Sequence, residues 1–161
     1  MDSLTKENDK MKDAKNNANR QKHASRCSIC GKEIHDEIHD SNNAFPFIGK
    51  CCNECDIKKV VPIRYALSKG YAILFIASDD SHGGVDAITH PERLSLEDLQ
   101  EKIGGYIEVV DLSDGYIAIV DEDGLLKGLP INKAWKLFEY SKDYPTPFVG
   151  NVLFMRKEQL K

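Results

Sequence analysis

Four of the five cysteines form two Cys-x-x-Cys pairs, Cys27 with Cys30 and Cys52 with Cys55. This spacing is typical of two pairs of thiolates that meet at one tetrahedral Zn2+ ion. Because sulfur would then occupy every coordination position, no position stays open for water or a substrate. The sequence therefore predicts a structural zinc centre and a small module that depends on the metal to fold.

The residues around each pair predict how the two halves of this centre are built. Gly31 directly follows the first pair, as a tight knuckle requires. Cys52 and Cys55 stand at the start of a predicted helix, whose free amides and dipole favour thiolate over thiol. A knuckle followed by a helix-borne pair indicates a treble-clef arrangement. Pro62 is expected to break that helix, which then resumes for a turn or two through Ser68.

The remaining cysteine, Cys51, is expected to be either a packed thiol or a redox-reactive one. The chain has no apolar run of about 18 residues and no charged leader followed by an apolar segment, so neither a membrane span nor a secretory signal is expected. The expected location is the reducing cytoplasm of a bacterial host. Cysteines in that compartment bind metal more often than they form disulfides.

Three segments are expected along the chain: a tail over residues 1–26, a zinc module over 27–69 and a larger domain over 70–161. The tail has too little apolar side chain to offset the entropy cost of ordering, so it is expected to be disordered. The larger domain combines strands with two short helices. This order predicts an α+β fold, a mostly antiparallel sheet with both helices on one face.

The strands of the larger domain are predicted from apolar runs and the turns between them, over residues 71–77, 85–90, 106–112, 116–120 and 148–155. The first run is apolar throughout and is expected to be buried on both faces. Asp114 and Gly115 supply the positive φ angles that a tight hairpin needs. Helices are predicted over 96–103 and 133–140, with Ser95 and Asn132 as their N-caps.

The charges argue against nucleic-acid binding by the larger domain. Residues 70–161 contain sixteen acidic and nine basic residues, and such a surface repels phosphate. Any contact with nucleic acid is therefore expected in the tail or in the zinc module. The candidate phosphate-binding residues in the module are Lys50, Lys58, Lys59 and Arg64.

One further group of residues is compatible with a ligand site. Gly128, Leu129, Pro130 and Asn132 lead into a predicted helix N-terminus, where backbone amides can hold an anion. A capped helix explains the same residues without a ligand. The chain contains no P-loop, dinucleotide fingerprint, nucleophile elbow or His-Glu-x-x-His motif. We therefore expect a protein that is not an enzyme.

Three places with acidic residues have simpler explanations than catalysis. Asp79, Asp80 and His82 stand together in a glycine-containing turn, which explains them without acid–base chemistry. Glu108 interrupts an apolar strand and is expected to face solvent. Residues 121–123 resemble the acidic start of a calcium loop but lack its later glutamate, so they are expected to form a solvated turn.

Two parts of the sequence resemble known proteins. GGYIEVV at 104–110, DEDGLLKGLPINKA at 121–134 and GNVLF at 150–154 resemble a domain family of unknown function that is common in bacteriophages, plasmids and integrative elements. The segments CSICGKEI, SNNAFP and GKCCNECDIKKVVPIR are similar to short cysteine-rich phage proteins. The resemblance implies an accessory protein of a mobile element and brings no established activity.

These observations lead to three functional hypotheses. The first is a non-enzymatic adaptor of a phage or mobile element that binds a host protein. The second is a nucleic-acid-binding protein that acts through the zinc module. The third is a protein that sequesters a small nucleotide at the Gly128–Asn132 approach and so counters host defence signalling.

Overall fold

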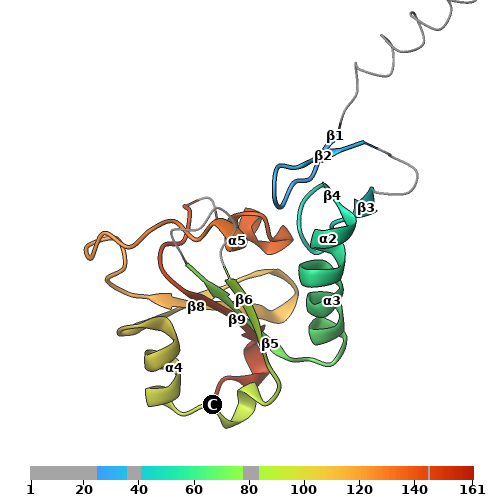
Figure 1. Cartoon of the computed structure of the whole chain (residues 1–161). Helices are drawn as coiled ribbons and strands as arrows, with labels where there is room; N and C mark the ends of the chain where they lie inside the picture. The colour runs from blue at the N-terminus through green and yellow to red at the C-terminus, as the bar shows by residue number, and fades with distance from the viewer. Residues whose placement is uncertain (1–24, 36–40, 78–83, 145) are drawn as a thin grey trace, which may run out of the picture.

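A five-stranded antiparallel sheet forms the centre of the computed structural model, which describes residues 25–35, 41–77, 84–144 and 146–161. The strands lie in the order β6-β5-β9-β8-β7 (Figure 1). Their bounds are β5 (Ala72–Ile76), β6 (Gly84–Ile88), β7 (Ile107–Asp111), β8 (Tyr116–Asp121) and β9 (Val152–Arg156). Every neighbouring pair is antiparallel. The predicted α+β fold with an antiparallel sheet is confirmed.

The central strands are buried on both faces, because their apolar runs leave no side for solvent. One face packs against α4 (Leu96–Ile103), and the other against α5 (Lys133–Lys136) and the cysteine-containing module. The two helices of the larger domain therefore lie on opposite faces of the sheet, not on one face as expected. Strands β5, β8 and β9 need cover on both sides, and a single layer of helices cannot supply it.

Local sequence signals define α4 and the β7–β8 hairpin as predicted. The Ser95 hydroxyl accepts from the Asp98 N–H at 3.1 Å, and the Asp98 carboxylate accepts from the Ser95 N–H at 2.8 Å. Gly104, with φ of 93°, ends the helix. Asp114 and Gly115 have φ values of 58° and 75° in the 3-10 turn η4 (Ser113–Gly115).

Helix α5 is shorter than its prediction over residues 133–140. Asn132 caps it as expected, with its Oδ1 accepting from the Trp135 N–H at 2.9 Å. The helix ends at Lys136 because the following backbone pairs with the cysteine-containing module: Ile48 N–H donates to Leu137 O, and Phe47 forms a β-bridge with Phe138. The other 3-10 turns in the described residues are η3 (Pro91–Arg93), η5 (Glu139–Asp143) and η6 (Lys157–Gln159).

The cysteine-containing module consists of two small hairpins and one helical run. The hairpins pair β1 (Ser25–Arg26) with β2 (Glu33–Ile34), and β3 (Asn42–Asn43) with β4 (Lys50–Cys51). The helical run comprises α2 (Asn53–Cys55), the π-helical η2 (Asp56–Val60) and α3 (Val61–Ser68). The rest of the predicted tail, residues 1–24, lies outside the described residues.

Pro62 does not break the helical run, so that prediction is wrong. Val61 stays helical, with φ of −59°, and its N–H donates to Asp56 O, five residues back. A π turn of this kind is wider than an α turn and displaces the carbonyls against which a proline ring would clash. The helical run therefore accommodates Pro62 by widening locally to a π turn.

The module and the sheet share one hydrophobic core. Cys27, Val60 and Ile63 from the module belong to the same cluster as Phe75 and Phe138 from the larger domain. Phe47 also reaches across, with its ring centroid 6.0 Å from that of Phe138. Within the described parts of the chain, no helix has the length and apolar character to cross a membrane.

Candidate metal centre

The four paired cysteines come together in one cluster within the module. The sulfur atoms of Cys27, Cys30, Cys52 and Cys55 all lie within 4.8 Å of one another. Cys30 Sγ and Cys52 Sγ are 3.8 Å apart. In a tetrahedral site with zinc–sulfur bonds of ~2.3 Å, two sulfur atoms are about 3.8 Å apart. The arrangement therefore fits a metal ion held by four thiolates.

The first pair lies in the knuckle between β1 and β2. Cys27 N–H donates to Lys32 O at 2.9 Å, and Gly31 N–H donates to Cys27 O at 2.8 Å. Gly31 adopts the left-handed conformation with φ of 73°, as its position after the pair predicted. Cys30 N–H lies 3.5 Å from Cys27 Sγ, so the turn aims an amide at the sulfur.

The second pair begins the helical run. Cys52 is the N-cap of α2, and Cys55 lies in its first turn. The amides at this end carry the positive pole of a helical run that continues to Ser68, and they favour negative sulfur. The structure thus places this pair on a helix start, as predicted.

The thiols of Cys27 and Cys55 differ in acidity. Burial alone would raise the pKa of Cys27, but the N–H groups of Cys30, Cys52 and Ile29 lower it to about 7. Burial and the neighbouring sulfur atoms raise the pKa of Cys55. A full set of four thiolates therefore requires a cation at their centre to offset the gathered negative charge.

Cys51 is adjacent in sequence to a member of the cluster but is not part of it. Its side chain is fully buried, and burial together with the Asp56 charge raises the pKa of its thiol to about 11. A protonated, inaccessible thiol is a poor nucleophile. The structure therefore favours the packed thiol over the redox-reactive one.

The four basic residues that were candidates for phosphate contacts have different surroundings. Arg64 donates to Phe45 O at 2.7 Å and to Asn43 O at 2.5 Å, so it clamps the turn after β3 onto α3. Lys58 pairs with Glu54 at 2.7 Å. Lys50 is exposed on β4, and Lys59 is half-buried beside Lys58. The clamp by Arg64 was not predicted, since its carbonyl partners are about 20 residues away in sequence.

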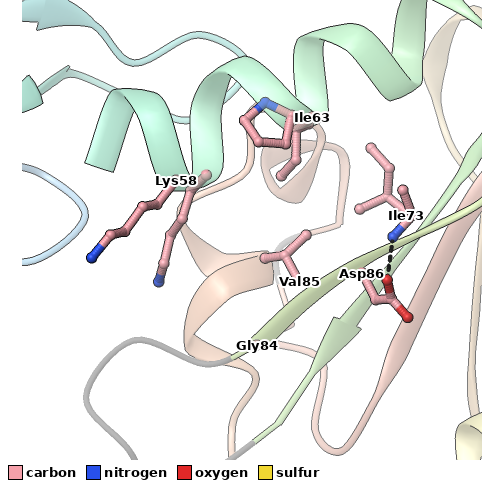
Figure 2. A pocket seen from close by; sticks show the side chains of 9 residues that line it. Lys58, Ile63, Ile73, Gly84, Val85 and Asp86 are labelled. Atoms are coloured by element: carbon pink, nitrogen blue, oxygen red, sulfur yellow. Dashed lines mark hydrogen bonds between the residues drawn. The ribbon is translucent and has the colours of Figure 1, made fainter. Parts of the chain in front are cut away.

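Lys58 and Lys59 lie at a groove between the helical run and strand β6 (Figure 2). This edge groove is a hollow of about 200 Å³, and its walls come from the helical run, β5 and β6. It is lined by Lys58, Lys59, Pro62, Ile63, Ile73, Gly84, Val85, Asp86 and Ala87.

Comparison with known families assigns the sheet-containing domain to a family. Residues 73–159, more than half of the chain, match the family described as a domain of unknown function (DUF3846). The chain belongs to the DUF3846 family. This confirms the resemblance seen in the sequence, and it leaves the cysteine cluster on the N-terminal side of the matched region. No curated protein and no solved structure matches the chain.

Within the DUF3846 domain, the Gly128–Asn132 approach has a structural use. Asn132 is fully buried, and its Nδ2 donates to Phe75 O at 3.0 Å and to Gly150 O at 2.9 Å. Its Oδ1 caps α5, so every polar atom of the amide is engaged. Gly128 turns the chain with φ of 67°, and Leu129 N–H donates to Gly124 O. This arrangement leaves Asn132 no donor for a bound anion.

The acidic turn of the DUF3846 domain is closed by an ion pair, so the predicted solvated turn is wrong at its first residue. The Asp121 side chain is fully buried and accepts from Lys127 Nζ at 2.7 and 2.8 Å. A β-carbon at Gly105 would lie only 2.6 Å from Asp121 Oδ2, which explains the glycine. Lys127 lies six residues after Asp121 in the sequence, and it reaches the Asp121 carboxylate because the turn brings the chain back toward it.

Of the other acidic candidates, the structure describes Glu108. Glu108 is exposed on the edge strand β7, as expected. Asp79, Asp80 and His82 lie outside the described residues.

Proposed function

We propose that this protein is a non-enzymatic, zinc-stabilised binding protein in which Zn2+ holds the module against the DUF3846 sheet. The observation that carries the proposal is the closed set of four sulfur atoms next to a core shared by both parts. Cys27, Cys52 and Cys55 are themselves members of that core. A metal at this position would therefore stabilise the packing of the module against the sheet.

The geometry supports a structural ion and a treble-clef module. A tetrahedral set of four thiolates is typical of zinc or iron, and zinc is the usual ion of closed structural sites. The chain forms a knuckle, then a second hairpin, then a helix that carries the second pair. This is the order of elements in a treble clef. With all four positions taken by sulfur, the ion would offer no position to a substrate.

The polar residues that first suggested chemistry support binding over catalysis. Asn132, Asp121 and Arg64 are all engaged in contacts that hold the fold together. By contrast, the helical run leaves Ile57, Val61 and Tyr65 between 48 and 69% exposed. Exposed apolar side chains on a stable scaffold are typical of a protein interface. The resemblance to phage and plasmid proteins supports a mobile-element accessory protein that acts on a host protein in the cytoplasm.

Native mass spectrometry of the purified full-length chain tests this proposal. We expect one zinc ion for each chain and no small molecule released on heating. Affinity purification from a bacterial lysate should then retain a defined host protein on the zinc-loaded chain. Nucleic acid that copurifies and dissociates with salt would instead favour the second hypothesis, and a released nucleotide the third. A chain isolated without a stoichiometric metal would refute the proposed centre.

A further inference from the structure

We propose that the edge groove is a docking site for an extended, acidic segment of a partner protein, which adds a strand to β6. This inference rests on the proposed binding function and names its surface. The groove combines three features that such a segment recognises: an unpaired strand edge, an apolar hollow and two lysines. Each of them has a separate basis in the structure.

Strand β6 is an edge of the sheet. It pairs with β5 along its full length, and no described strand lies on its other side. The Ala87 N–H donates to Asp86 Oδ1 at 2.9 Å, the dashed line in Figure 2. The Ala87 N–H bonds to a side chain of its own strand, so it can donate instead to a carbonyl of a docking strand. A docking strand can replace the Asp86 carboxylate there and continue the ladder.

The hollow beside β6 accepts one anchoring side chain. Its apolar wall is formed by Pro62 and Ile63 from the helical run and by Ile73 and Val85 from the sheet. Its volume of about 200 Å³ is below the range of roughly 300–1,000 Å³ that pockets for whole small molecules occupy. In an extended segment alternate side chains point the same way, so one apolar residue can enter the hollow.

Two lysines against the single Asp86 carboxylate at the groove favour an acidic segment over a basic one. Lys58 and Lys59 both line the groove on the side that the helical run forms. Lys58 pairs with Glu54, but both side chains are more than half exposed, and a surface pair of this kind exchanges at little cost. A carboxylate of the partner can therefore take its place.

The opposite edge of the sheet carries more acidic charge, although Asp111 there pairs with Lys157 at 2.7 Å. Strand β7 carries Glu108 and Asp111, and Glu122 lies beside it in a smaller hollow of about 90 Å³. An acidic segment is repelled there, because like charges face it at short range. Of the two sheet edges, only β6 suits the proposed partner.

A display library of random octapeptides tests the proposal on the zinc-loaded full chain. We expect enrichment of peptides that combine Asp or Glu with apolar residues at alternating positions. An enriched peptide, synthesised and titrated against 15N-labelled protein, should shift the amides of β6 and the helical run. Charge reversal in Lys58→Glu/Lys59→Glu should weaken its binding at least about tenfold.

Two further variants keep the test independent of folding. Ala87→Pro removes the edge amide that does not pair with β5 and should also weaken binding about tenfold. The matched control Lys157→Glu/Lys161→Glu makes the same charge change outside the groove and should leave affinity within about twofold. All variants must keep their zinc and their dispersed amide spectrum.

Failure of this inference can be separated from failure of the proposed function. No enrichment, enrichment of basic peptides, or binding that all groove variants retain would overturn the docking site. A chain that still holds zinc and retains a host protein would then bind through another surface. Loss of zinc stoichiometry in the wild-type chain would instead refute the proposed function itself.

Discussion

Replacement of Asn132 by alanine should destabilise the protein severely, because this side chain joins three parts of the fold. Its Oδ1 caps α5, and its Nδ2 donates to a carbonyl at the end of β5 and to Gly150 O ahead of β9. Loss of an N-cap costs about 1 kcal/mol. Each buried carbonyl left without its donor costs about 1 kcal/mol more. The total of about 3 kcal/mol is a large fraction of the ~5–15 kcal/mol that stabilises a typical domain.

Urea unfolding of the zinc-saturated protein measures this change. Trp135, the single tryptophan, is buried next to the site and reports unfolding through its fluorescence, with circular dichroism as an independent probe. At a typical slope of ~2 kcal/mol per molar urea, the midpoint should fall by about 1.5 M. Asn42→Ala is the matched control, since its amide bonds to Asn53 at the exposed surface. The control should change stability by less than about 0.5 kcal/mol.

A small effect at Asn132 would refute the reasoning. If Asn132→Ala lowered stability by less than about 1 kcal/mol, the amide would not be the structural link described here. If the same variant then lost binding of a nucleotide, the anion-site hypothesis would regain support.

Three other changes have expected outcomes. Lys127→Ala should lower the free energy of unfolding in urea by about 3 kcal/mol, because it leaves the buried Asp121 carboxylate without its ion-pair partner. Asp121→Ala should lower it less, since Lys127 can reach solvent, and equal losses would contradict this explanation. Cys52→Ser should abolish stoichiometric zinc in native mass spectrometry while Cys51→Ser retains it, and the reverse result would reassign the ligand. Zinc should be released as the pH falls, because Cys27, with a pKa of about 7, regains its proton, as do Cys30 and Cys55, whose pKa values are raised. A chelator competition across pH would show this release, and pH-independent affinity would argue against thiolate ligands.

Features coded by short-range chemistry were predicted well from the sequence. The cysteine pairs, the Ser95 cap and the Asp114–Gly115 turn each depend on residues a few positions apart. Their geometry follows from local backbone preferences and ligand spacing. The position of the cysteine cluster and of several strands was therefore predicted correctly.

Features decided by tertiary contacts could not be predicted. Helix α5 stops early because Phe47 and Ile48, some 90 residues before it, bond to the backbone beyond its end. Arg64 serves as a clamp because a distant turn presents two carbonyls to it. Pro62 stays within a helical run because the preceding turn widens. In each case a partner remote in sequence, or a change in helix type, overrides a local rule.

The separation of α4 and α5 onto opposite faces is indicated by one feature of the sequence. Strand β5 reads as a continuous apolar run, and such a strand needs cover on both sides. A strand buried on both faces and two helices on a single face are incompatible unless another element covers the second face. The cysteine-containing module shares that task with α5.

X-ray absorption at the zinc edge, combined with a count of metal ions for each chain, tests the proposed zinc centre. We expect one zinc ion with four sulfur neighbours at about 2.3 Å. We also expect that removal of zinc by a strong chelator shifts the amide signals of β1 to α3 away from their folded positions, because the metal holds that module against the sheet. Nitrogen or oxygen neighbours in place of sulfur, or a metal-free chain with an unchanged amide spectrum, would contradict this proposal.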